Sequence, residues 1–201
     1  MHRFRTTRLT SVLAIGTFGM LAACAPKADE TTDTLATTPP ATATTPTPTV
    51  DAPWTDANVV DAITVANQGE VDYSQIAAEK ATNPEVKAFA QQMVKDHGAM
   101  LESVKALATR LNVMPASNDK ANDLREEAQK DINDLNGKAV GKDFDVEFME
   151  EQVDMHQETL DLLTDLDNRT TNADLKAAIA EAKPKVQAHL DKAKTIKDKV
   201  D

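Results

Sequence analysis

From about Thr55 onward, the hydrophobic residues recur at intervals of three and four positions and do not alternate strictly with polar ones. This spacing places them on one face of a helix with 3.6 residues per turn, so it predicts helices and not strands. Very few glycines interrupt the pattern. It predicts five helices, at residues 55–81, 83–111, 119–135, 143–167 and 172–200.

The connections between these segments predict an antiparallel arrangement. Asn83 is a suitable N-cap and Pro84 suits the first helical position, so the second helix starts almost directly after the first. A turn this short makes neighbouring helices antiparallel. Residues 55–201 therefore predict one all-α domain, an up-and-down four-helix bundle with one extra short helix.

Four polar residues interrupt the apolar faces of the four long helices. His97, His156 and His189 each lie in the middle of a different helix, and Glu70 occupies a similar place on the first one. With a rise of about 1.5 Å per residue, all four lie at comparable depth in the bundle. Imidazole and carboxylate groups bind Zn, Cu, Fe or Mn, so we expect one transition metal ion at Glu70, His97, His156 and His189.

A second interpretation of these residues stays open. A buried histidine is commonly hydrogen-bonded to a neighbour, and the four side chains could form a polar network that sets the register of the helices. A diiron ferroxidase site is not expected, because it needs Glu-x-x-His on two helices. The residues three positions before the histidines are Val94, Val153 and Val186.

The N-terminal segment predicts export and lipid attachment. Residues 1–23 have the layout of a secretory signal peptide, with three arginines before an apolar stretch. That stretch ends in the sequence LAAC, which resembles a bacterial lipobox, and Cys24 is the only cysteine. We therefore expect Cys24 to carry a lipid that anchors the protein to a membrane. Ala25, in place of Asp, resembles the pattern of lipoproteins sorted to the outer membrane and facing the periplasm.

Composition separates a tether from the helical domain. Within the predicted tether, residues 24–54, positions 31–50 hold ten Thr and four Pro, which predicts a disordered chain. The net charge is −11, and loss of the three leader arginines leaves 19 basic against 33 acidic residues, a charge of −14. This acidic balance argues against a nucleic acid partner and makes cations the natural small partners.

A series of short motifs runs through the helical segments in a fixed order: QGE at 68–70, NPEVKAFA at 83–90, MVKDH at 93–97, FD at 144–145, QVDMH at 152–156, and Pro184 with HL at 189–190. The series resembles the domain-of-unknown-function 4142 family over about residues 55–200. The resemblance implies a ferritin-like helical bundle in the bacterial envelope, with no settled activity. Its motif positions include Glu70, His97, His156 and His189.

Together these observations predict a membrane-tethered periplasmic ferritin-like domain that binds a metal ion in its core. No catalytic residue is expected, because the chain contains no Gly-rich phosphate loop and no recognisable Ser/His/Asp set. The resemblance favours binding over catalysis, because some ferritin-like relatives bind metals without being oxidases. A weaker alternative is an oxidoreductase or hydrolase that uses the site with an open coordination position. The alternative prediction is a structural or stress-response interaction module of the cell envelope that holds no metal.

Overall fold

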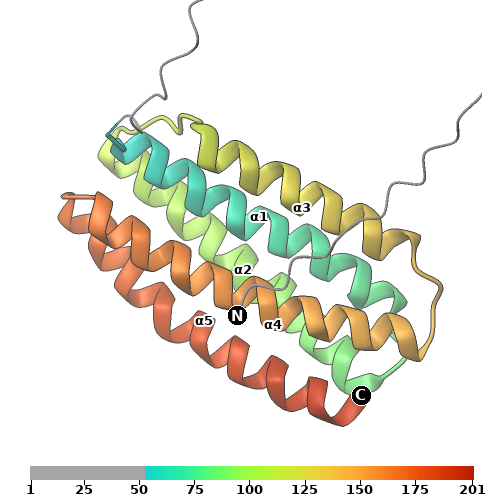
Figure 1. Cartoon of the computed structure of the whole chain (residues 1–201). Coiled ribbons are helices and arrows are strands. Elements are labelled where there is room, and N and C mark those ends of the chain that lie inside the picture. The colour runs from blue at the N-terminus through green and yellow to red at the C-terminus, as the bar shows by residue number, and fades with distance from the viewer. Residues whose placement is uncertain (1–52) are drawn as a thin grey trace, which may run out of the picture. The chain divides into compact units, whose positions relative to one another are not determined.

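The computed structural model describes residues 53–201, which form five α-helices and no strand (Figure 1). The predicted signal peptide, Cys24 and nearly all of the tether lie outside the described residues. The helices are α1 (Asp56–Lys80), α2 (Pro84–Leu111), α3 (Asp119–Gly137), α4 (Lys142–Arg169) and α5 (Ala173–Val200). The predicted all-α bundle is confirmed. Within residues 53–201, no helix has the length and apolar character needed to cross a membrane.

Helix starts follow local signals in the sequence. Thr55, Asn83 and Asn172 are the N-caps of α1, α2 and α5, and each side chain accepts hydrogen bonds from backbone N–H groups of the first turn. Pro84 stands at the start of α2, where its missing N–H has no helical partner to lose. The short turns that result give two antiparallel hairpins, α1–α2 and α4–α5 (Figure 1).

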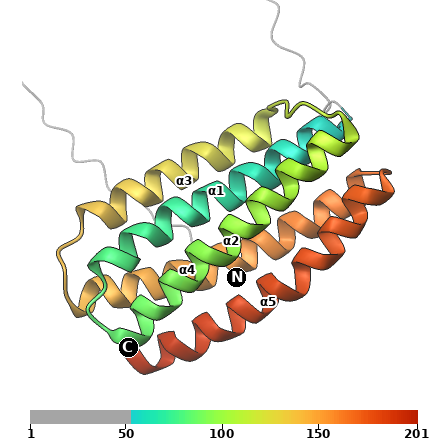
Figure 2. The same cartoon turned by 180° about the vertical axis from the view of Figure 1, so that it is seen from behind.

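The four long helices form the bundle, and α3 is added to its outside. Contacts are most extensive within each hairpin, and α3 packs mainly on α1. Both views show α3 beside α1 and on the opposite side of it from α5 (Figures 1 and 2). The core that can hold a buried site is therefore the space enclosed by α1, α2, α4 and α5.

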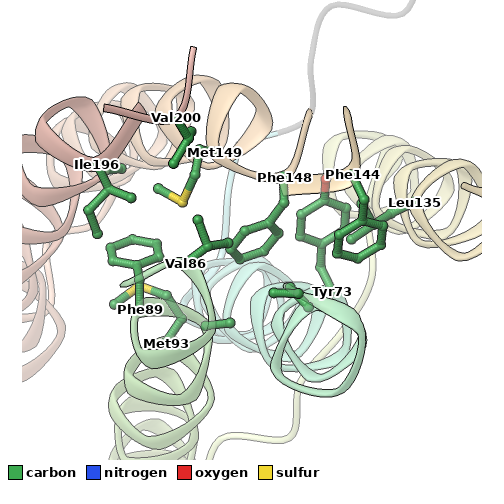
Figure 3. Close-up of a cluster of buried hydrophobic side chains, with 14 residues drawn as sticks. Tyr73, Val86, Phe89, Met93, Leu135, Phe144, Phe148, Met149, Ile196 and Val200 are labelled. Carbon is green, nitrogen blue, oxygen red and sulfur yellow. The ribbon is translucent and has the colours of Figure 1, made fainter. Parts of the chain in front are cut away.

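Two hydrophobic clusters fill this core, one toward each end of the bundle. The first contains most of the aromatic rings, with Tyr73 stacked on Phe148 at a centroid distance of 5.6 Å (Figure 3). The second is built from aliphatic residues such as Leu166 and Ile179. Each long helix contributes residues to both clusters. On each helix, the predicted site residue lies between the residues of the first cluster and those of the second. A polar layer thus divides the core.

Two aspartates tie the hairpins together at opposite ends. Asp145 of α4 accepts hydrogen bonds from the backbone N–H groups of Thr82 and Asn83, at 3.0 and 2.8 Å, and from the Thr82 hydroxyl. Asp56 of α1 accepts from the Thr170 hydroxyl at 3.2 Å and from the α5 N-cap amide at 2.7 Å. Each aspartate therefore holds the turn of the other hairpin and fixes how far the hairpins can slide.

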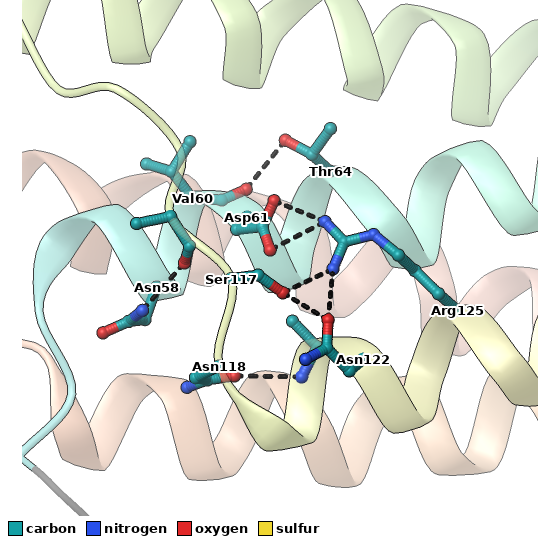
Figure 4. Close-up of polar contacts among 10 residues, drawn as sticks. Asn58, Val60, Asp61, Thr64, Ser117, Asn118, Asn122 and Arg125 are labelled. Carbon is teal, nitrogen blue, oxygen red and sulfur yellow. Dashed lines mark hydrogen bonds and ion pairs between the residues drawn. The ribbon is translucent and has the colours of Figure 1, made fainter.

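The packing of α3 on α1 depends on one ion pair and one glycine. Arg125 donates two hydrogen bonds to the buried Asp61 carboxylate, at 2.7 and 2.8 Å, and a third to the Ser117 hydroxyl (Figure 4). A side chain at Gly69 would place its Cβ 3.0 Å from the Cβ of Ala128, so the helices approach closely only because Gly69 has none. These contacts hold α3 against α1.

The facing sides of α3 and α4 are both acidic. Glu127 and Asp131 of α3 and Glu158 of α4 line a groove between the two helices. Burial, followed by the charges of Asp131, Asp154 and Glu158, raises the pKa of Glu151 to about 7. Burial and the neighbouring acids Glu127 and Asp154 likewise raise the pKa of Glu158. α3 packs mainly on α1 and makes few contacts with α4, an arrangement that limits the repulsion between these like charges.

We expect Asp145→Ala to lower the free energy of unfolding by about 3 kcal/mol, because two backbone donors lose their acceptor and an unpaired buried donor costs roughly 1–3 kcal/mol. Urea unfolding followed by circular dichroism measures the change. The matched control is Asp143→Ala, an exposed aspartate in the same helical turn, with an expected change of about 0.5 kcal/mol or less. Equal losses in the two variants would contradict the hairpin tie.

Glu151→Gln should stabilise the protein at high pH and leave it unchanged at low pH. The pKa of Glu151 is raised above its ordinary value of 4.5, so stability is lost as the pH rises through about 7. Glutamine removes that loss. Because solvent screens this half-buried group, we expect a gain of only about 1 kcal/mol at pH 8 and none at pH 4. Urea unfolding at pH 4 and pH 8 tests this prediction, with the exposed neighbour Glu150→Gln as control. A gain in stability of the same size at the two pH values would contradict it.

Candidate metal centre

Three histidines from three different helices meet in the polar layer between the hydrophobic clusters. His97 comes from α2, His156 from α4 and His189 from α5, and their ring centroids lie 5.3 to 5.5 Å apart. Their exposed fractions are 2%, 1% and 6%. One nitrogen of each ring lies within 4.8 Å of the corresponding nitrogens of the other two. The structure thus brings three of the four expected ligands together.

The helical repeat explains why these imidazoles point inward. His97 follows Met93 by four residues and precedes Leu101 by four, and both neighbours are buried. Residues four apart share a helix face, so burying Met93 and Leu101 carries His97 into the core between them. Met93 belongs to the first hydrophobic cluster and Leu101 to the second. The position of His97 is therefore set by packing on both sides.

Hydrogen bonds to acceptors fix two of the rings. His97 donates from Nδ1 to the side-chain oxygen of Asn67 at 3.0 Å. The amide nitrogen of Asn67 is used in a 2.8 Å bond to the carbonyl of Ile63, so its oxygen is the atom that faces the ring. His156 donates from Nδ1 to the backbone carbonyl of Gln152 at 2.8 Å. Both protons therefore sit on Nδ1, and Nε2 of each ring keeps its lone pair.

The third ring is held in the same manner but with the opposite nitrogen. His189 donates from Nε2 to a carboxylate oxygen of Asp96 at 3.2 Å, which leaves its Nδ1 unprotonated. Within residues 53–201, Nε2 of His97, Nε2 of His156 and Nδ1 of His189 are buried and have no hydrogen-bond partner. These are the inner nitrogens of the site. Three lone pairs are thus directed into one small volume, which is the arrangement of a metal centre with its outer partners in place.

The surroundings keep the three imidazoles neutral. Burial lowers the pKa of His97 well below its ordinary value of 6.5, and the other two imidazoles lower it further. Burial lowers the pKa of His156 to about 4, against the opposing effect of its bond to Gln152. Burial also lowers the pKa of His189, although Asp96 opposes this. A neutral imidazole is the form that binds metal, so at neutral pH no proton has to be displaced.

Glu70 lies behind His156 and not among the inner nitrogens. Its Oε1 is 3.6 Å from Nδ1 of His156, the nitrogen that faces away from the other rings. Both carboxylate oxygens accept from the side-chain amide of Gln152, at 2.9 and 3.1 Å. Burial raises the pKa of Glu70 to about 7, and the bond from Gln152 opposes this. The structure places Glu70 as an outer neighbour of the site; a direct bond from it to an ion stays a prediction.

Three residues that orient the site were not identified from the sequence: Asn67, Asp96 and Gln152. The sequence contained an indication for two of them. Asn67 lies three residues before Glu70 and Gln152 lies four before His156, so each is on the core-facing side of its helix. Asp96 had none. It is adjacent to His97 in the sequence but pairs with a histidine of α5, a contact that only the packing of α2 on α5 creates.

Two solved structures share this fold. The chain is similar to a structure titled "Crystal structure of DUF305 fragment from Deinococcus radiodurans", with a TM-score of 0.62, 11% identity, and 74% of this chain and 99% of the other covered. It is also similar to "CopM in the Cu(II)-bound form", with a TM-score of 0.59, 18% identity and the same coverage of both chains. At these identities the likeness establishes the fold alone. No curated protein sequence matches this chain.

The family comparison covers most of the chain. A family model described as "Domain of unknown function (DUF4142)" matches residues 37–196. The match includes all five helices up to the last turn of α5, and with them the three histidines and their outer partners. The resemblance expected from the ordered motifs is confirmed, and the chain belongs to the DUF4142 family.

Proposed function

We propose that this protein binds one divalent transition metal ion through His97, His156 and His189. The observation that carries the proposal is the convergence of three buried, unprotonated inner nitrogens without partners. Leaving a buried polar atom unpaired costs roughly 1–3 kcal/mol, and here three such atoms face one another. A cation bonded to all three removes this cost, whereas no hydrogen-bond arrangement among three acceptors can do so.

The donor set indicates which ions suit the site. Three imidazoles without a thiolate favour Zn, Cu, Fe or Ni, and Cu(II) binds most tightly of the common divalent ions to nitrogen ligands. The similar structure of CopM was determined in a Cu(II)-bound form, which supports testing copper first. Asn67, Asp96 and the Gln152 carbonyl would hold the three rings in orientation. Glu70, next to His156, would add negative charge close to the ion.

Titration of chelator-treated, untagged protein with Cu(II), Zn(II), Fe(II) and Mn(II) should show one ion bound per chain. At a free metal concentration 100 times the Kd, binding adds about 2.7 kcal/mol to stability. For a domain of this size that raises Tm by roughly 5–10 °C. Thermal unfolding and elemental analysis measure the two quantities. We expect Cu(II) to give the lowest Kd of the series.

Matched variants separate ligands from their neighbours. His97→Gln and His189→Gln should abolish the metal-dependent rise in Tm, because each removes one ligand. Asn67→Ala should retain one ion per chain and weaken binding by about 10–100-fold, as expected for a partner that orients a ligand. Glu70→Gln should also retain one ion per chain. If this variant bound no ion, Glu70 would be identified as a ligand. A Tm that no metal raises would refute the proposal and favour the envelope interaction module, with structural histidines.

The proposed setting is the cell envelope, with the bundle tethered through lipid at Cys24 and facing the periplasm from the outer membrane. The support comes from the sequence, in the lipobox-like LAAC and the Thr/Pro-rich segment that follows it. A tether of this kind would keep the acidic bundle near a membrane that its own charge does not attract. Ions entering the periplasm would then be the pool from which the site is filled.

Cys24→Ala should move the protein from the membrane fraction to the soluble fraction of its host, because the thiol that would carry the lipid is gone. Fractionation and immunoblotting measure the distribution. Ala25→Ser is the matched control and should stay with the outer membrane, while Ala25→Asp should shift toward the inner membrane. A Cys24→Ala protein that still sediments with membranes would overturn the proposed anchor.

A further inference from the structure

A cavity of about 100 Å³ lies in the core beside the histidine layer. All four long helices line it, and its walls include Ala66, Asn67, His97, Met100, Ile179 and Ala182. Most of this lining is apolar. Protein interiors contain few voids larger than a water molecule, so a cavity of this size beside the unpartnered Nε2 of His97 is unusual.

The two sides of the histidine layer differ in how they are filled. On one side Phe89 and Met93 are fully buried in the first hydrophobic cluster, and the Phe89 ring lies 6.4 Å from that of His156. On the other side lies the cavity, where His97 forms part of the wall and its Nε2 has no partner. An additional ligand in the cavity would therefore lie against His97, on the side of the layer that the first hydrophobic cluster does not fill.

The cavity also reaches the surface. Its lining includes the exposed residues Ser103 of α2 and Glu181 and Lys185 of α5. These two helices make far fewer contacts with each other than each makes with its own hairpin partner. Entry of a small molecule between α2 and α5 would therefore not require the helices of either hairpin to separate.

We propose that this cavity binds a small aromatic molecule that carries one nitrogen or oxygen donor and occupies an open coordination position of the metal ion. The inference rests on the proposed metal binding, because three protein ligands leave a fourth position free on a four-coordinate ion. The cavity of about 100 Å³ is smaller than the apolar cavity of 150 Å³ that is known to hold benzene, but its mouth between exposed residues lets part of a single ring project toward solvent. Apolar walls disfavour a bare charged ligand.

The experiment uses Co(II)-loaded protein, whose visible spectrum responds to a change of ligand. Phenol and pyridine are titrated separately, and toluene, which matches them in size but lacks a donor, is the control ligand. Phenol or pyridine should change the Co(II) spectrum and toluene should not. In Ala182→Leu, which fills the cavity without touching a ligand, the apparent Kd for phenol should rise roughly tenfold or more. Ala180→Leu, an exposed position on the same helix, should behave as wild type.

The outcomes separate this inference from the proposed function. Bound Co(II) with a spectrum that neither phenol nor pyridine changes overturns the cavity site and leaves metal binding intact. The same Kd in Ala182→Leu and wild type, with Co(II) bound to both, also overturns it. If Ala182→Leu does not fold, Ala182→Val takes its place with a smaller expected rise. Protein that binds none of Co(II), Cu(II) and Zn(II) refutes the metal site, and the inference fails with it.

Discussion

Three buried imidazole lone pairs that face one another are the constraint on which the rest of this structure depends. Such an arrangement requires that each ring carry its proton on the outer nitrogen, and Asn67, Gln152 and Asp96 each supply an acceptor there. Without those acceptors, the rings could turn and form hydrogen bonds with one another. The outer partners therefore leave the three inner nitrogens unprotonated, which is the state that the proposed cation binding requires.

The bundle tolerates this polar layer because packing above and below it is apolar and the hairpins are fixed at both ends. Aromatic residues fill one end of the core and aliphatic residues the other. Asp56 and Asp145 hold the turns of opposite hairpins, so a helix cannot slide by one turn to bury the histidines elsewhere. Stability thus comes from the two clusters and from the hydrogen bonds of Asp56 and Asp145. The histidine layer between the clusters is not needed for that stability and can take part in binding.

Sequence pattern predicted the helices to within two residues at their ends, because N-caps and the 3.6-residue period are local properties. The convergence of the histidines followed from the same period, since a residue on an apolar stripe points toward the core. Glu70 shows where this reasoning stops. It lies on the core face at the expected depth, yet its carboxylate turns to Gln152, and only the side-chain packing between α1 and α4 decides that direction. Asp96 of α2 accepts a hydrogen bond from His189 of α5, and the sequence could not predict this contact for the same reason.

The distribution of the three histidines over the hairpins has a mechanical consequence. His97 belongs to the α1–α2 hairpin, and His156 and His189 belong to the α4–α5 hairpin, while contacts between hairpins are sparser than contacts within them. An ion held by all three would act as a removable cross-link across this weaker interface. In a chain with a single cysteine, which cannot form an internal disulfide, metal supply would then set how readily the two halves of the bundle separate.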